Sequence, residues 1–213
     1  MAIVSLDSLD LAALVCSRVC HDVISPVGAI VNGLEVLEED NDPAMQEFAL
    51  DLIRKSARQA SARLQFARLA FGAAGSAGAA IDLGDAEAVA KGMYGDEKIT
   101  LSWTAPRALL PKNRVKLLLN LLVLATGAIP RGGAISVTVE GDEEASLFTL
   151  VAKGINARIP PHAEALLAGE PEGGSVDAHA IQPYYTGLVA RAAAMSVRLA
   201  IADDTVTVTA ASA

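Results

Sequence analysis

Apolar residues recur at alternating steps of three and four along residues 6–37, and this repeat constrains the fold more than any other feature of the chain. The repeating positions are Leu6, Leu9, Ala13, Cys16, Cys20, Val23, Val27, Ile30, Leu34 and Leu37. Such spacing forms one apolar seam along a helix and is typical of helices packed lengthwise in a bundle. Ser5 or Asp7 can cap the start of this helix, and the acidic run 38–40 marks its end.

A second helix is predicted directly after the first. Asp42 and Pro43 supply an N-cap residue and a proline at the first helical position. The apolar repeat then continues to about residue 71, through Met45, Phe48, Leu52, Ile53, Ala60, Leu64 and Ala67. We therefore assign residues 1–71 to a helical hairpin and the small residues at 72–80 to a linker. Because two helices cannot bury their apolar seams alone, we expect a second copy to complete a dimeric four-helix bundle.

Residues 81–213 have the pattern of an α+β sandwich. Helices are expected at 85–94, 113–129 and 178–195, and strands at 99–104, 135–140, 147–152, 197–201 and 205–209. The strand pairs 135–140 with 147–152 and 197–201 with 205–209 read as hairpins. This order predicts helices on one face of an antiparallel sheet.

Composition excludes several classes of function. The chain has 17 basic and 25 acidic residues, a net charge of −8, so a general basic field for nucleic acid or a membrane surface is not expected. The N-terminus lacks the basic flank of a secretory signal, and the apolar stretch 117–129 is too short to span a bilayer. Cys16 and Cys20, the only cysteines, suggest neither a disulfide scaffold nor a metal site. A cytoplasmic protein is expected.

His21 lies beside the seam, close to two residues that a stable helix avoids. Pro26 and Gly28 cost roughly 3 and 1 kcal/mol in a helix interior, and Pro26 cannot donate a hydrogen bond to the carbonyl of Asp22. The residues around the direction of His21 on the helix are small or polar, and we assign four of them to a docking surface: Arg18, Ser25, Gly28 and Asn32. A lone histidine is more often an exposed polar residue, but here the proline and glycine favour an accessible, functional imidazole.

The segment HDVISPVGAI, residues 21–30, resembles the H-box of sensor histidine kinases. In that motif a histidine followed by an acidic residue precedes a proline and an apolar pair, and the matches here are His21, Asp22, Pro26, Ala29 and Ile30. In those kinases the histidine lies on the first helix of a dimeric hairpin bundle and carries the phosphoryl group. The resemblance implies that His21 is phosphorylated.

The second domain resembles the Bergerat ATP-binding domain of the same kinases, but without its chemistry. Asn120 matches the first of two asparagines on the kinase helix, whereas Leu124 stands at the magnesium ligand. Ala152 stands where an aspartate reads adenine, with Gly154 retained after it, and the glycine-rich loop is reduced to Gly187. Because leucine cannot bind magnesium and alanine cannot bind the base, we expect neither a nucleotide-binding nor a metal site.

A phosphorylatable histidine helix joined to a nucleotide-blind domain resembles the ChpT-type histidine phosphotransferases of alphaproteobacteria, most specifically over residues 14–39 and 52–73. The resemblance implies a homodimer without its own cofactor. It would pass a phosphoryl group between the receiver domain of a hybrid histidine kinase and that of a response regulator controlling the cell cycle. The receiver would supply the magnesium. Two alternatives are a dimeric scaffold in which His21 transfers nothing and a residual ATP-dependent kinase.

The chemistry of transfer needs a neutral imidazole, and an unperturbed imidazole is mostly neutral at about pH 7. Its nitrogen would attack an aspartyl phosphate, and the reverse step would deliver the group to a second receiver. Asp22 is expected to orient the ring or hold its proton, although it serves equally well as a solvated helix charge.

The second helix carries a strip of basic residues, called the basic strip below, whose charge suits an acidic receiver pocket. They are Arg54, Lys55, Arg58, Arg63 and Arg68. The alternative for any one of them is a solvated ion pair along the helix, such as Asp51 with Lys55.

Overall fold

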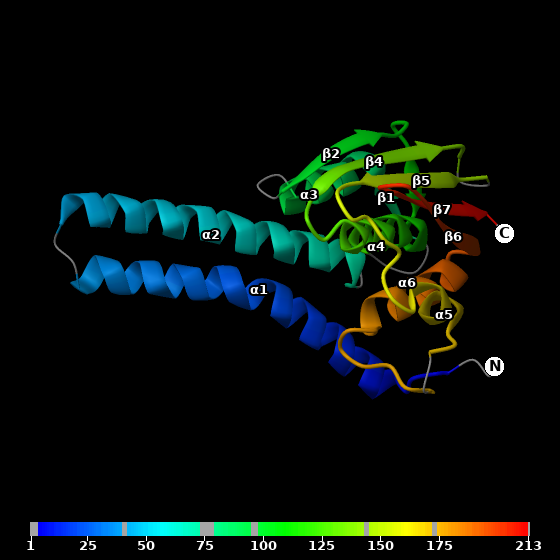
Figure 1. Cartoon of the computed structure of the whole chain (residues 1–213), viewed down its shortest axis with the longest axis horizontal. Coiled ribbons are helices and arrows are strands. Elements are labelled where there is room, and N and C mark those ends of the chain that lie inside the picture. Colours follow the sequence, from blue (N-terminus) through cyan, green and yellow to red (C-terminus); the bar gives the residue numbers. More distant parts are fainter. Residues whose placement is uncertain are drawn as a thin grey trace.

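The computed structural model describes residues 4–39, 42–72, 79–94, 98–142, 145–171 and 174–212. A long helical hairpin projects from an α+β domain, and the chain ends on a strand of that domain (Figure 1). The hairpin consists of α1 (Ser8–Glu39) and α2 (Pro43–Ala70). Most of the predicted linker at 72–80 falls outside the described residues.

Both hairpin helices begin at aspartate caps. Asp7 Oδ1 accepts hydrogen bonds from the main-chain N–H groups of Leu9 at 2.7 Å and Asp10 at 2.9 Å. The N–H groups of Asp10 and Leu9 lower the pKa of the Asp7 carboxyl. Asp42 caps α2 through the N–H of Ala44 at 3.2 Å, with proline following it as predicted. Of the two candidate caps for α1, Asp7 is therefore the one used, not Ser5.

The two helices of the hairpin lie close at its far end and diverge toward the domain. Gly33 is buried against α2, where a Cβ atom would lie 2.7 Å from the Ile53 side chain, so glycine allows the close approach. Nearer the domain α1 bends, and its N-terminal half turns away from α2 (Figure 1). Pro26, buried inside α1, accounts for the bend because it interrupts the hydrogen-bond ladder.

The beginning of the chain packs on the domain instead of on the seam. Leu6, which precedes α1, joins Leu11, Leu14 and Val15 against a buried cluster formed by Leu166, Val176, Ile181 and Tyr184. The prediction that Leu6 opens the bundle seam is wrong, since these domain residues cover it.

The domain is built on a five-stranded sheet in the order β2-β4-β5-β7-β6. Its strands are β2 (Ile99–Thr104), β4 (Gly133–Glu140), β5 (Leu147–Lys153), β6 (Met195–Ala202) and β7 (Thr205–Ser212). β2 and β4 pair in parallel, and the other pairs are antiparallel. The expected purely antiparallel sheet is therefore corrected to a mixed one. The helix α4 (Lys112–Ala128) crosses between β2 and β4 and returns the chain in the same direction.

The helices α4 and α6 (Ile181–Ala192) cover one face of this sheet, as expected (Figure 1). Alternate strand residues point into the core between them and are almost fully buried, among them Ile135, Val137, Phe148, Leu150, Val206 and Val208. The predicted strand pairs 135–140 with 147–152 and 197–201 with 205–209 form, each within longer strands.

Short elements escaped prediction because they contain too few residues to show a period. They are β1 (Ala80–Asp82), its antiparallel partner β3 (Leu109–Pro111), and α5 (Ala163–Ala168). The helix expected at 85–94 is α3 (Leu83–Tyr94). The helix expected at 178–195 is shorter, because β6 already begins at Met195.

Helix α1 is also long and apolar enough to cross a membrane. Only 6% of its most apolar stretch is buried within the single chain. Core helices of soluble proteins and signal sequences meet the same criterion, so length and composition alone assign α1 to no membrane. The low burial does show that α1 presents a large uncovered apolar surface.

Candidate functional site

His21 lies on α1 just before the bend, and its side chain is 85% exposed. Ser25, Gly28 and Asn32, predicted to share its face, are exposed as well. A Cβ atom at Gly28 would meet nothing within 4 Å, so this side of α1 is open. The structure thus leaves the imidazole accessible from solvent.

The carboxylate of Asp22 is held mainly by Arg18. Arg18 Nε donates to Asp22 Oδ2 at 3.1 Å, one helical turn apart. The other oxygen, Oδ1, lies 3.7 Å from His21 Nδ1, which is too long for a hydrogen bond but close enough for electrostatic attraction to a charged ring. The structure therefore brings Arg18, Asp22 and His21 together with Asp22 in the middle.

The main-chain oxygen of Asp22 is also bonded, by a residue of the other helix. Pro26 has no N–H to donate to it, and Arg63 Nη1 on α2 donates instead. Arg63 was expected on an exposed basic strip, but it turns inward toward α1. Sequence patterning missed this contact because it joins residues 41 positions apart.

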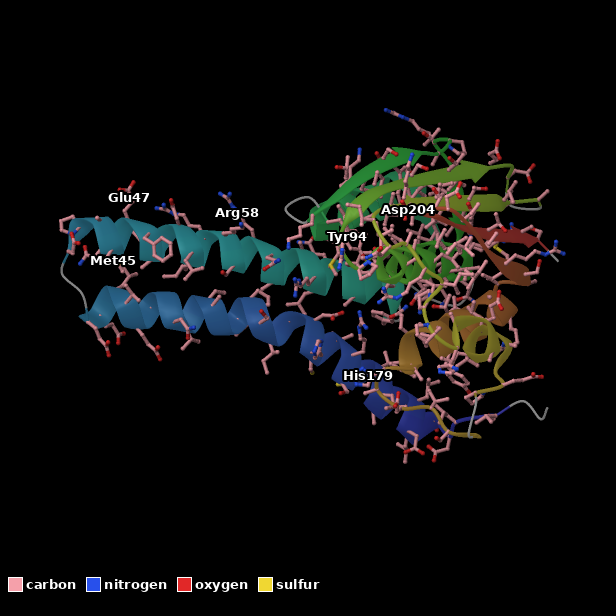
Figure 2. The ribbon with its side chains drawn as sticks, in the orientation of Figure 1. Met45, Glu47, Arg58, Tyr94, His179 and Asp204 are labelled. Carbon is pink, nitrogen blue, oxygen red and sulfur yellow. The ribbon has the colours of Figure 1, made fainter. Side chains whose placement is uncertain are left out.

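The rest of the basic strip is exposed. Arg58 points away from α1 (Figure 2), and Lys55 and Arg68 are likewise exposed. Arg54 Nη1 pairs with Asp51 Oδ1 at 3.2 Å, so Asp51 has Arg54 as its partner in place of the suggested Lys55.

Cys16 and Cys20 are both exposed, one turn apart on α1. Hydrogen bonding with the Cys16 thiol raises the pKa of the Cys20 thiol, which keeps it protonated. Within the described ranges, no group of three or more histidine, cysteine, aspartate or glutamate residues could hold a metal ion.

Asn120, the one kinase-like asparagine, is buried and serves as a link between helices. Its Nδ2 donates to the carbonyl oxygens of Ala70 at 3.0 Å and Lys116 at 2.8 Å. Its Oδ1 accepts from Gln182 Nε2 at 2.9 Å. The side chain therefore ties the end of α2 to α4 and α6.

The other kinase-like positions serve packing. Ala152 is buried in the apolar core, and Leu124 is buried as well. A Cβ atom at Gly154 would collide with the carbonyl of Gly132, and one at Gly187 with that of Leu167. Gly187 lies inside α6, so these two glycines allow close main-chain contacts and shape no phosphate loop.

Tyr184 is a second residue that sequence reasoning missed. Its hydroxyl donates to the carbonyl of Val4 at 2.9 Å and accepts from the N–H of Leu6 at 3.2 Å. This fastens the chain before α1 to α6. No local signal identifies it, because its partners lie at the opposite end of the sequence.

The fold and site define a class of protein. An exposed histidine on a helical hairpin, joined to an α+β domain with the apolar residues Leu124 and Ala152 at the positions compared with nucleotide ligands, agrees with the histidine phosphotransferase class. The sequence family described as "Histidine phosphotransferase C-terminal domain" matches residues 83–205.

Relatives agree with this class over the whole chain. "Protein phosphotransferase ChpT" from Brucella abortus (strain 2308) is 53% identical over 204 residues, which is 95% of this chain and 96% of that protein. A solved structure, "1.7 Angstrom Structure of a Bacterial Phosphotransferase", is 48% identical with a TM-score of 0.89, covering 99% of this chain and 100% of that one. The chain belongs to the histidine phosphotransferase family and is a phosphotransferase of a phosphorelay.

Proposed function

We propose that His21 is the phosphoryl carrier. In this proposal the chain relays the group between receiver-domain aspartates of a hybrid histidine kinase and of a response regulator that controls the cell cycle. The observation that carries the proposal is the 85% exposed imidazole on an open helix face, with a carboxylate beside it. The other two histidines of the chain, His162 and His179, lie in the second domain.

The proposed transfer breaks the bond between phosphorus and the aspartate oxygen of the receiver and forms a bond between phosphorus and a ring nitrogen of His21. The receiver carboxylate leaves with its electron pair. As the new bond forms, positive charge develops on the ring, and the Asp22 carboxylate 3.7 Å from Nδ1 stabilises it. Because Nδ1 faces Asp22, Nε2 is the nitrogen that attacks. The magnesium ion belongs to the receiver, so this chain uses no cofactor.

The docking surface around His21 is formed by the exposed residues Ser25, Gly28 and Asn32 and by the half-buried Arg18. Its small side chains permit a close approach of the receiver. The exposed cations Lys55, Arg58 and Arg68 on α2 favour an acidic partner and increase the rate of association.

A homodimer explains the uncovered apolar seam of the hairpin. Large apolar side chains on α1 and α2 are exposed in the single chain, including Leu9 at 80%, Ile24 at 70%, Phe48 at 62% and Leu64 at 51%. A contiguous apolar surface of this kind marks an interface. Light scattering should give the mass of two chains, and Phe48→Glu should shift it toward one.

A second copy accounts for the seam better than a membrane does. Burying Arg18, Asp22 and His21 in lipid is costly, and Arg18 and Asp22 contact each other and α2 instead. We therefore place the protein in the cytoplasm.

The decisive experiment mixes the chain with a phosphorylated receiver domain or, separately, with ATP and magnesium. Acid-labile label should arrive from the receiver and not from ATP, and His21→Ala should abolish it. His162→Asn is the matched control, since asparagine tolerates the left-handed backbone of His162 (φ 58°) and should transfer normally. Labelling of the chain by ATP would show that it is a kinase. If neither ATP nor any of several phosphorylated receivers labels the chain, a scaffold that transfers no phosphoryl group becomes the better account.

A further inference from the structure

A cavity of about 350 Å³ lies in the angle between α1 and α2, close to His21. It exists because the bend in α1 carries the N-terminal half of the helix away from α2 (Figure 1). The last turn of α3, the end of α4 and the start of α6 complete its walls. Its volume falls at the lower end of the range for small-molecule sites.

The apolar part of the wall contains aromatic side chains among aliphatic ones. Phe66 and Tyr94 are nearly fully buried, and their rings meet edge to face with centroids 6.2 Å apart. Leu124 also lines the cavity and offers no ligand for a magnesium-bound triphosphate. This wall suits a compact aromatic ring and does not suit a nucleotide.

The polar part of the wall carries excess positive charge. Arg18 and Arg63 line the cavity, and Asp22 is its one acidic lining residue among those the structure describes. A guanidinium group has five N–H donors, and the pair with Asp22 uses one of those on Arg18. His179 lies at the same cavity, beside the N-terminal half of α1 (Figure 2). Carboxylates are among the anions that guanidinium groups bind well.

We propose that this cavity binds a small aromatic carboxylate. The ring packs against the apolar part of the wall, and the carboxylate meets Arg18 and Arg63. The occupant also touches Asp22, and so it alters phosphoryl transfer at His21. This second statement rests on the proposed function, whereas binding itself does not.

A matched pair of glycine substitutions can fill the cavity or spare it. Gly127 on α4 lines the cavity, and a Cβ atom there meets only Pro160, at 3.8 Å. Gly92 on α3 lies away from it, and a Cβ atom there meets only Ala62, also at 3.8 Å. Replacing a glycine inside a helix improves helix propensity, so both variants should fold. Gly127→Phe occupies the cavity, and Gly92→Phe is the control.

Calorimetric titration with indole-3-carboxylate tests the site, with neutral indole and aliphatic butyrate as comparison probes. Saturable binding is expected for the unchanged protein and Gly92→Phe, and binding at least about tenfold weaker for Gly127→Phe and for both comparison probes. No saturable heat at millimolar probe, equal binding by Gly127→Phe, or equal binding of indole would overturn the site.

Transfer from a phosphorylated receiver is then measured with and without the probe. A change of rate in the unchanged protein that is absent in Gly127→Phe supports the effect on His21, and an unchanged rate at saturating probe overturns that effect. Absence of transfer without any probe would count against the proposed function alone, because the titration is read independently.

Discussion

Arg63 on α2 donates a hydrogen bond to the main-chain oxygen of Asp22 on α1, the oxygen that Pro26 leaves without its helical donor. The contact satisfies a main-chain acceptor that would otherwise be lost to the bend. It also ties the two helices together one residue from His21. The proline and the arginine are therefore two halves of one local arrangement, which keeps α1 bent while its hydrogen bonding remains complete at this carbonyl.

Replacing Arg63 should destabilise the fold at this point. Arg63→Met keeps much of the aliphatic stem but leaves the Asp22 oxygen without its charged donor, which should cost about 1–3 kcal/mol of unfolding free energy. Urea unfolding at a fixed protein concentration measures it. Arg58→Met, on the exposed side of the same helix, should change the free energy by less than about 0.5 kcal/mol. Equal effects of the two variants would contradict the assigned role of Arg63.

The same contact predicts energetic coupling to Pro26. In Pro26→Ala the new N–H can donate to the Asp22 oxygen, so Arg63→Met should cost roughly 1 kcal/mol less in that background than in the natural one. A double-mutant cycle of unfolding free energies measures the difference. Strict additivity would show that the arginine does not replace the missing helical donor.

Asn120 should matter for the joint between hairpin and domain. Asn120→Leu removes the side-chain donor of the Ala70 carbonyl and leaves the Gln182 amide with only its longer bond to Thr186 Oγ1. It should lower the unfolding free energy by about 2–4 kcal/mol. Asn113→Leu is the control, since its bond to the Ala192 carbonyl is exposed. A loss from Asn113→Leu as large as that from Asn120→Leu would argue against the buried network.

Tyr184 should hold the start of α1 on the domain. Tyr184→Phe keeps the ring but removes the hydroxyl that bonds Val4 and Leu6, at a cost of about 1 kcal/mol. Hydrogen exchange of the amides at 6–11 should become faster, while exchange in the sheet stays unchanged. Tyr185→Phe serves as the neighbouring control. Unaltered exchange at the start of α1 would remove Tyr184 from this role.

Much of the site could be predicted locally, and some of it could not. The exposed face of His21 follows from residues within about three turns of one helix, because helical geometry sets which side chains share a direction. The inward turn of Arg63 could not be predicted in this way, since charge alone suggests a solvated side chain. Leu124 and Ala152, at the positions compared with kinase ligands, led to the expectation that the domain binds no nucleotide. The linking role of Asn120 could not be predicted, because it depends on α2 and α6 meeting beside α4.

The sequence by itself determined the two hairpin helices, the Asp42 cap of the second helix, the strand pairs β4–β5 and β6–β7, and the open surroundings of His21. Each of these depends on periodicity, capping or turns among near neighbours. Only the tertiary structure decided the parallel pairing of β2 with β4, the docking of Leu6 on Tyr184, and the bond from Arg63 to Asp22. These contacts join residues as far as 178 positions apart. Their free energy comes from burial and partner choice in the assembled fold, which no local pattern encodes.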